Sequence, residues 1–313
     1  MRKFSVVLTV LLACLLLTFS VAAQAGEITV GNGYSEETDP GKAGAEAAAK
    51  AKKALGGEAK VVLVFDQVGK TAEDKEKMLA GIASEFDSKI IFGCSSYAPI
   101  TQDCNTGTVG VMALGGDISA VPAVSDIEGG HGECGKRIGK ALKPAVPEKG
   151  GKVVLLWGSC HVNKNDALVK GVCEELGEKF PVAGGAASKG EFLYSEGKVL
   201  LKSNLGLLLT GDFECGFSAK KGDDLEGVIA TAGEACEQAM DGGKGIVVLA
   251  FDCGGRRGTL KDSCAKELAA MKGAVDGAPI FGFYGSGETG PKDNDSPAAG
   301  VGYHIVICAI KSK

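Results

Sequence analysis

Histidine and tryptophan are scarce in this sequence of 313 residues, and the scarcity of histidine limits its metal chemistry. The chain has three histidines, His131, His161 and His304, none of them at ligand spacing to a cysteine, and no C-x-x-C pair occurs among its eleven cysteines. Structural zinc sites are built from such clusters, so we expect no metal site. A basic cluster is also missing and the net charge is −5, so we expect neither nucleic acid nor anionic lipid as a partner.

Aromatic residues make up 6% of the chain, whereas glycine is abundant at 48 residues. The glycines follow no G-X-Y period, so they indicate tight turns and close backbone approaches and exclude collagen. Proline- or serine-rich linkers are absent, which favours packed lobes over separate domains on flexible tethers.

One long apolar run, Phe4 to Ala22, follows Met1-Arg2-Lys3 and precedes Ala23-Gln-Ala25. These are the parts of a secretory signal peptide, so we expect residues 1–25 to be cleaved and the protein to be exported, periplasmic or extracellular. Cleavage would remove two cations and no acid, which makes the net charge −7. An alternative is a lipoprotein-type site that leaves a lipid anchor on Cys14.

A single sequence pattern occurs three times along the chain. An apolar strand running into glycine and small residues is found at Ile90–Tyr97, Pro181–Ser188 and Ala278–Pro291. About 30 residues earlier in each case lies another apolar strand, at Val61–Phe65, Val153–Trp157 and Ile246–Phe251, with a helical pattern between the two. The chain therefore reads as three internal β-α-β-α-β-β repeats. Repeat three is expected to open with strand Gly227–Ala230 and a short helix, Gly233–Met240.

Continuously apolar strands such as Val153–Leu156 are typical of a sheet covered on both faces, whereas the helical segments show one apolar stripe. The fold class predicted is therefore α/β, with packed mixed sheets covered by helices.

Gly285-Ser-Gly-Glu-Thr-Gly290 matches the G-x-G-x-x-G pattern of dinucleotide-binding proteins. That pattern needs a helix that receives the pyrophosphate at its N-terminus, and here Pro291-Lys-Asp-Asn-Asp-Ser-Pro297 follows. We therefore expect no nicotinamide or flavin cofactor.

Asp252-Cys-Gly-Gly-Arg-Arg257 follows an apolar strand of repeat three. Arg256 or Arg257 could offer a bidentate fork to an anionic ligand, or both could be solvated in a surface loop. Glu288 follows the other strand of the same repeat, and the two loops should open on the same side if those strands are parallel.

Several side chains could act as nucleophiles. The neighbours Cys160 and His161 would point to opposite sides of an extended chain, which favours a structural cysteine. Ser95-Ser96, Ser188 and Ser286 occupy related places in the repeats and could line a site on a pseudo-threefold axis, although turns also favour serine.

Cysteines occur on the predicted helices of repeats two and three, and not on those of repeat one. Exported proteins often contain disulfides, so Cys134 with Cys173, and Cys236 with Cys264, are candidate pairs.

Several segments in order resemble the FIST sensory domain, over nearly all of the expected mature chain. They are Gly33-Tyr34-Ser35, Asp39-Pro40, Ala43-Gly44, Val61–Phe65, Gly93-Cys94-Ser95, Pro181–Ala187, Cys253-x-x-Arg256, the helix with Glu267, and Pro279–Pro291. The resemblance assigns 27–212 to the FIST N-terminal region and 213–313 to the C-terminal region. Tyr97-Ala-Pro99 departs from the family, which tends to have a glycine and a glutamate there.

The resemblance implies a sensory module that binds small ligands, with amino acids proposed, near Cys253, Arg256, Tyr284, Gly287 and Glu288. The signal would then pass through a partner such as a membrane signalling protein. The rival interpretation is a hydrolase of small amides with a serine or cysteine nucleophile near the pseudo-threefold centre. A nucleophile within hydrogen-bond reach of a base would favour the hydrolase.

Overall fold

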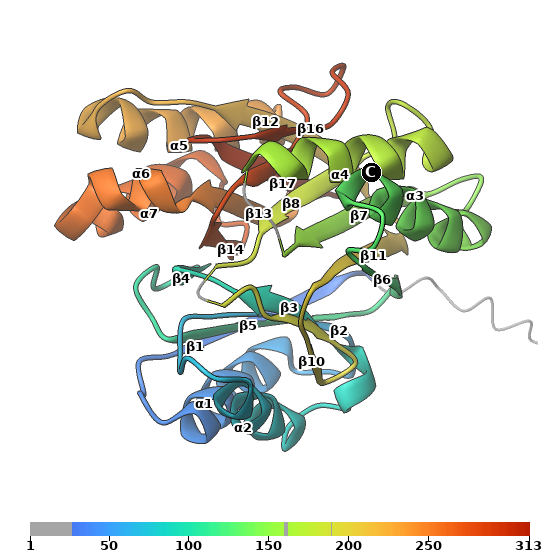
Figure 1. The fold of residues 1–313 in the computed structure, drawn as a ribbon. Helices are drawn as coiled ribbons and strands as arrows, with labels where there is room; N and C mark the ends of the chain where they lie inside the picture. Colours follow the sequence, from blue (N-terminus) through green and yellow to red (C-terminus); the bar gives the residue numbers. More distant parts are fainter. Residues whose placement is uncertain (1–26, 160–161, 189) are drawn as a thin grey trace, which may run out of the picture.

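Three groups of helices enclose three β-sheets in the computed structural model of this chain, which describes residues 27–159, 162–188 and 190–313 (Figure 1). The predicted signal peptide, Cys14 and the Cys160-His161 pair lie outside these residues. Within the described ranges, no helix is long and apolar enough to cross a membrane.

Each repeat contributes helices and strands in a similar order. Repeat one contains β1 (Thr29–Ser35), α1 (Pro40–Leu55), β2 (Ala59–Asp66), α2 (Ala72–Ala83), β3 (Ile91–Ser95), β4 (Ala98–Thr101) and β5 (Val109–Gly115). Repeat two contains β6 (Ile118–Asp126), α3 (His131–Leu142), β7 (Gly151–Gly158), α4 (Val162–Leu176), β8 (Val182–Ala186), β9 (Leu193–Ser195), β10 (Lys198–Leu200) and β11 (Ser203–Gly211). Repeat three contains β12 (Glu214–Lys220), α5 (Leu225–Met240), β13 (Gly245–Cys253), α6 (Gly254–Leu260), α7 (Cys264–Ala274), β14 (Ile280–Gly285), β15 (Glu288–Gly290), β16 (Ala299–Val301) and β17 (Ile305–Lys311).

The three repeats build their sheets with one strand order. It reads β1-β5-β2-β3 in repeat one, β6-β11-β7-β8 in repeat two and β12-β17-β13-β14 in repeat three. In each repeat one pair is parallel, namely β2 with β3, β7 with β8 and β13 with β14. The predicted repeats and the mixed α/β fold class are therefore confirmed.

Each repeat also places a short strand on the sheet of another repeat, which the sequence analysis did not predict. These exchanged strands are β4, which pairs with β14, β9, which pairs with β3, and β15, which pairs with β8. All three pairings are antiparallel, and each exchanged strand extends the sheet of the repeat that receives it.

Three equivalent backbone hydrogen bonds mark the points where the chain crosses between repeats. Their donors and acceptors are Tyr97 N to Tyr284 O at 2.8 Å, Ser188 N to Ser95 O at 3.0 Å, and Ser286 N to Ala186 O at 3.0 Å. The bonds link repeat one to three, two to one, and three to two, so the exchange closes into a ring with pseudo-threefold symmetry.

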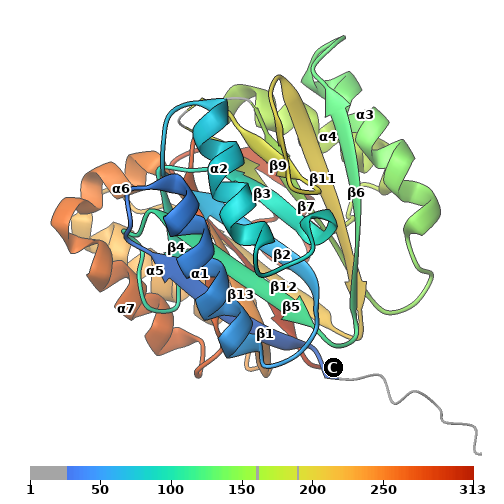
Figure 2. The same cartoon turned by 90° about the horizontal axis from the view of Figure 1, so that it is seen from below.

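Aromatic side chains from different repeats pack together where the sheets face one another. The ring of Phe65 lies 5.9 Å from that of Trp157, 5.2 Å from that of Phe281 and 4.5 Å from that of Phe283, measured between centroids. The helices cover the outer faces, with α1 and α2 on one side, α3 and α4 on a second, and α5 to α7 on a third (Figures 1 and 2). The apolar strand residues are buried on both faces, as predicted for Val153–Leu156.

A glycine recurs at the same place in the third strand of every repeat. A Cβ on Gly93, Gly184 or Gly282 would lie 1.8, 2.0 or 1.7 Å from a carbonyl oxygen of the neighbouring parallel strand. Only a residue without a side chain permits so close an approach of the two strands.

Two predictions for repeat three are wrong. Gly227–Ala230 is not a strand but the first part of α5, because the Asp224 side chain accepts a hydrogen bond from Gly227 N and caps a helix there. The segment after Asp252 is not an open loop either, because Cys253 caps α6 and Gly254–Leu260 is helical.

Candidate functional site

The segments that carry the predicted ligand-binding residues meet at one edge of the repeat-three sheet. Strands β13 and β14 are parallel, and their ends are paired as Cys253 with Gly285. The chain therefore leaves both strands on the same side, as the sequence analysis expected.

Arg256 lies wholly inside the protein and bonds to protein groups. Its Nε donates to Asp252 Oδ1 at 2.7 Å and its Nη2 to Glu267 Oε1 at 3.0 Å. Further hydrogen bonds reach Thr231 Oγ1 at 3.1 Å and Val228 O at 2.9 Å. Ligand binding by Arg256 stays a prediction. In this structure its guanidinium has no exposed surface, and most of its N–H groups already donate to protein acceptors.

The Arg256 network, by which we mean Arg256, Asp252, Glu267, Tyr284 and Asn105, holds two buried carboxyls beside one cation. Burial raises the pKa of Asp252, while Arg256 opposes the rise. Burial and then the charge of Asp252 raise the pKa of Glu267 well above its usual range. Arg256 pairs with both carboxyls, and Glu267 retains its proton more readily than an ordinary glutamate.

Tyr284 and Asn105 connect this network to repeat one. The Tyr284 hydroxyl hydrogen bonds to Glu267 Oε2 at 2.7 Å and accepts from Asn105 Nδ2 at 3.0 Å. Asn105 Nδ2 also donates to Cys264 O at 2.6 Å. Because Asn105 follows β4, these bonds fix the chain that enters from repeat one onto repeat three.

The second cluster, which we call the inner cluster, consists of Cys253, Glu288 and the backbone of His304. Glu288 is 1% exposed, and its Oε2 accepts from His304 N at 3.1 Å. Cys253 N donates to His304 O at 3.2 Å, so this backbone joins the two residues. Glu288 Oε1 is buried and accepts from no described N–H or hydroxyl group, and the side chain that hydrogen bonds to this carboxyl is the weak donor Cys253.

Burial controls the acidity of both side chains in the inner cluster. It raises the pKa of Glu288 well above its usual range, while the His304 N–H opposes the rise. Burial, followed by the nearby Glu288, raises the pKa of the Cys253 thiol to about 11. At neutral pH Cys253 is therefore a thiol, and Glu288 has a strong tendency to be protonated.

More exposed residues form the rim beside the inner cluster. The Tyr97 ring, 37% exposed, lies against α6, since a Cβ on Gly254 would be 2.4 Å from Tyr97 Cδ2. Ser286 Oγ lies 3.5 Å from the Tyr97 hydroxyl. On the same helix, Tyr303 packs on Gly255 and its hydroxyl lies 2.7 Å from Thr259 Oγ1. Residues from repeats one and three thus share this rim.

The structure divides four of the five predicted residues between two clusters. Cys253 and Glu288 meet in the inner cluster, whereas Arg256 and Tyr284 belong to the Arg256 network. Gly287 contributes its carbonyl, which accepts from Ala186 N at 2.7 Å on β8. Asp252 and Cys253 are successive strand residues with opposite side-chain directions, which explains the division. Sequence reasoning gave no binding role to the rim residues: Tyr97 reaches α6 only because its segment crosses from repeat one to repeat three, and Tyr303 reaches α6 from the distant loop before β17.

Repeat one contains a buried ion pair of its own. Lys75, with no exposed surface, donates to Asp66 Oδ1 and to Val68 O, and the Tyr194 hydroxyl donates to Asp66 Oδ2. Tyr194 lies on the exchanged strand β9, so a buried polar network secures a second exchanged segment.

The candidate nucleophilic serines mostly bond to backbone. Ser95 Oγ donates to Ser188 O, and Ser96 Oγ donates to Asp66 O at 3.0 Å. Ser188 Oγ is buried without a partner among the described residues. None of Ser95, Ser96 and Ser188 hydrogen bonds to a histidine or carboxylate side chain among the described residues.

The four cysteines proposed for disulfides carry free thiols. Cys134 donates to Ser125 O and accepts from Asn204 Nδ2, and Cys264 donates to Lys261 O. The proposed pairings are therefore not formed in this structure, and their formation under oxidising conditions stays a prediction.

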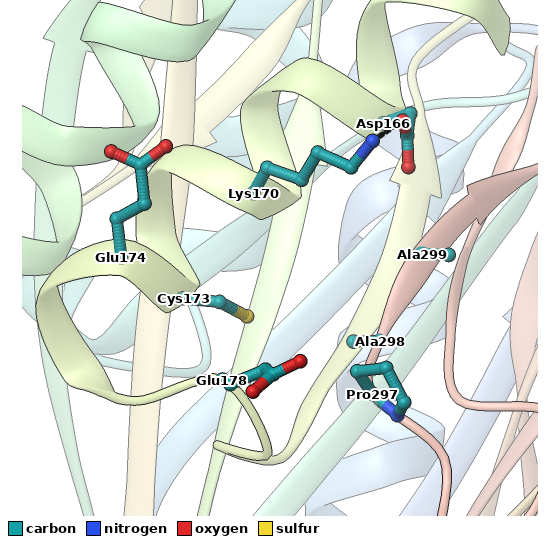
Figure 3. A pocket seen from close by; sticks show the side chains of 8 residues that line it. All are labelled: Asp166, Lys170, Cys173, Glu174, Glu178, Pro297, Ala298 and Ala299. Carbon is teal, nitrogen blue, oxygen red and sulfur yellow. Dashed lines mark ion pairs between the residues drawn. The ribbon is translucent and has the colours of Figure 1, made fainter.

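A surface hollow of about 340 Å³ lies between α4 and residues 297–299 and shares no residue with either cluster (Figure 3). Its Lys170 is paired with Asp166 at 2.7 Å, and its Glu174 with Lys136 at 3.0 Å. Burial raises the pKa of its Cys173 to about 11, so this thiol is a poor nucleophile.

Sequence comparison identifies the family. The FIST N domain model matches residues 60–224, and the FIST C domain model matches residues 203–291. The chain belongs to the FIST family. FIST domains are sensory domains for small ligands, which supports a small-molecule partner for this FIST chain. A comparison with curated proteins found no match. The boundary predicted between 212 and 213 stays a prediction.

A comparison with solved structures found similar chains at low sequence identity. A structure titled "Cyanuric acid hydrolase: evolutionary innovation by structural concatenation" is 9% identical, with a TM-score of 0.50, covering 91% of this FIST chain and 100% of its own. A cyanuric acid hydrolase from A. caulinodans is 12% identical, with a TM-score of 0.47, covering 91% and 99%. The first of these likenesses shows the fold alone.

Proposed function

We propose that this FIST protein is an exported sensor that binds an amino acid or a similar small polar molecule at the inner cluster, without transforming it. The observation that carries the proposal is the buried Glu288 carboxyl, whose Oε1 accepts from no described N–H or hydroxyl group and whose hydrogen-bond partners among the described residues are the His304 N–H and the weakly donating Cys253 thiol. Buried polar atoms are almost always paired in proteins, and exceptions concentrate at functional sites.

Glu288 suits the ammonium group of such a ligand. Its raised pKa means that the carboxyl tends to hold a proton in the free protein. Binding of an ammonium group favours the carboxylate, so the proton leaves when the ligand arrives. Affinity for an amine ligand should therefore rise with pH, by at most about tenfold per pH unit, until the pH reaches the pKa of Glu288 in the free protein.

A thermal-shift screen of the chain from Gly26 onward against amino acids and small organic acids tests this function, because a binder stabilises the folded protein. Calorimetry of the best ligand in two buffers of different ionisation enthalpy would then reveal proton release. Glu288→Gln keeps the shape of the side chain and should remove both the thermal shift and the proton release. Ser203→Ala, at a surface position on β11, is the control. A parent-like thermal shift in Glu288→Gln would refute the proposed site.

The rival function, hydrolysis of a small amide, finds support in the fold shared with a cyanuric acid hydrolase. The side chains favour it less, because a cysteine nucleophile needs a lowered pKa and that of Cys253 is raised to about 11. Incubation with the amides of the ligands found in the screen distinguishes the two, since release of ammonia would establish the hydrolase.

Export is also part of the proposal, with cleavage after Ala25 or, as the alternative, a lipid anchor on Cys14. The partner that would receive the signal is a membrane signalling protein. Mass spectrometry of the mature N-terminus decides between the two forms, because a diacylglyceryl group on Cys14 would exclude cleavage after Ala25.

A further inference from the structure

Two cysteine thiols on neighbouring strands of repeat three lie in contact. In the antiparallel pair of β12 with β17, Cys215 is opposite Ile310 and Cys308 is opposite Phe217. The two cysteines are therefore diagonal neighbours whose side chains point to the same face of the sheet. Their thiols hydrogen bond to each other, and both side chains pack in the same apolar cluster. We propose that Cys215 and Cys308 form a disulfide that ties β12 to β17 when the protein meets a small-molecule disulfide.

The positions of the two strands allow this bond. Diagonal neighbours in an antiparallel pair lie about 7–8 Å apart, with their Cβ atoms somewhat closer, and disulfides join Cα atoms up to about 7 Å apart. Strand β12 is at the edge of its sheet, with β17 as its one neighbour there. A small movement of this edge strand towards β17 therefore brings the two sulfur atoms from hydrogen-bond contact to bonding distance.

The two thiols differ in their access to the surface. Cys308 has no exposed surface, whereas Cys215 is partly exposed and lines a surface hollow of about 440 Å³. Contact with Cys215, and then burial, raise the pKa of the Cys308 thiol well above its usual range. Because the thiolate is the nucleophilic form, Cys308 is a poor first nucleophile. An oxidant that enters the hollow would therefore react with Cys215 first.

The reaction balances with a small-molecule disulfide as the oxidant. The Cys215 thiolate attacks one sulfur of that molecule, which forms a mixed disulfide and releases the other half as a thiolate. The Cys308 sulfur then attacks Cys215 Sγ, and its proton passes to the departing second half. The protein loses two hydrogens and two electrons in total, and the oxidant becomes two thiols that leave through the hollow.

The cross-link would fix the last strand of the chain. Strand β17 lies between β12 and β13, and the segment from Cys215 to Cys308 contains most of repeat three. A cross-link across so long a segment restricts the unfolded chain, so we expect the melting temperature to rise by roughly 4–8 °C on oxidation. The pair shares no residue with the inner cluster, and the inference is therefore independent of the proposed function.

Peptide mapping tests the bond directly, because trypsin places each of the two cysteines on a separate peptide. Peptides 203–220 and 293–311 contain Cys215 and Cys308 as their single cysteines. The chain from Gly26 onward is reduced, incubated with oxidised glutathione, blocked with N-ethylmaleimide in denaturant and digested without reductant. We expect the two peptides to be joined, with a mass two hydrogens lower than the sum of their masses.

Three variants test the order of the two steps. In Cys308→Ser the reaction should stop at the mixed disulfide, so peptide 203–220 should gain one glutathionyl group. In Cys215→Ser peptide 293–311 should keep its thiol, because Cys308 has no exposed surface. Cys104→Ser is the control, since it removes another partly exposed thiol, one that contacts Thr106, and it should form the cross-link at the rate of the parent.

Peptides 203–220 and 293–311 that stay separate in the oxidised parent overturn the inference, as does a glutathionyl group that stays on Cys215 when Cys308 is present. An oxidised parent that melts at the temperature of the reduced parent contradicts the tie between β12 and β17. Formation of the cross-link in the parent, a trapped mixed disulfide in Cys308→Ser and a parent-like Cys104→Ser would together establish it.

Discussion

Replacing Arg256 tests the buried network more severely than any other substitution. Arg256→Met removes the positive charge while keeping much of the volume of the side chain, and leaves Asp252 and Glu267 buried without their cation. Breaking a buried ion pair in this way costs about 3–5 kcal/mol. For a chain of this size we expect the melting temperature to fall by roughly 6–12 °C.

The loss of stability in Arg256→Met should depend on pH in a defined direction. Without Arg256, the pKa values of Asp252 and Glu267 rise further, because the cation that opposes their burial is gone. A carboxyl whose folded-state pKa is raised stabilises the protein below its unfolded-state pKa, and that stability is lost as the pH rises through the folded-state pKa. The difference between parent and variant should therefore be larger at pH 8 than at pH 5.

Urea unfolding followed by tryptophan fluorescence measures the effect, since Trp157 is the only tryptophan and is fully buried. Arg137→Met is the matched control, because Arg137 pairs with Asp126 at the surface and its loss should cost no more than about 1 kcal/mol. An Arg256→Met variant as stable as this control, with the pH dependence of the parent, would refute the claim that the buried Arg256 charge stabilises the protein.

Four further outcomes are expected. Lys75→Met should destabilise the protein by about 3–5 kcal/mol in urea unfolding, because it leaves Asp66 buried without its cation. Gly282→Ala should lower the melting temperature sharply, since its Cβ would lie 1.7 Å from Ala250 O, whereas Gly258→Ala, with open space around it on α6, should raise stability by about 0.5–1 kcal/mol. Glu288→Gln should reduce the loss of stability between pH 5 and pH 8, because burial raises the pKa of Glu288. At pH 8 Cys253, with a pKa of about 11, should react with iodoacetamide roughly 100-fold more slowly than an ordinary thiol, as measured by peptide mass spectrometry.

The repeats could be predicted from sequence because the information is local. Apolar runs such as Val153–Trp157 are long, and each is followed by a helical stripe and a glycine-containing strand, so periodicity alone defines the unit. Gly227–Ala230 misled the prediction because a short apolar run fits a buried strand and a buried helical turn equally well.

The exchanged strands and the distribution of charge could not be predicted in the same way. Strand β15 contains three residues, and its partner β8 lies about 100 positions earlier, so no local pattern specifies the pairing. Arg256 and Arg257 are adjacent and chemically identical, and only the orientation of α6 decides which one faces Asp252. The sequence predicted that the segments after β13 and β14 lie on the same side of the sheet, as observed, but which side chain enters which cluster depends on contacts between repeats.

The exchange of strands between repeats has a consequence for the order in which the chain can fold. Strand β17, near the end of the chain, lies between β12 and β13, and β15 completes the edge of the repeat-two sheet next to β8. Repeat one in turn receives β9 from repeat two and gives β4 to repeat three. The repeat-one sheet has all its strands once β10 has been synthesised, whereas the repeat-two sheet waits for β16 and the repeat-three sheet for β17, so the ring closes only with the last strands. Pairings of such high sequence separation make folding slow, and the incomplete chain would expose the unpaired edge of β8 until β15 has been synthesised.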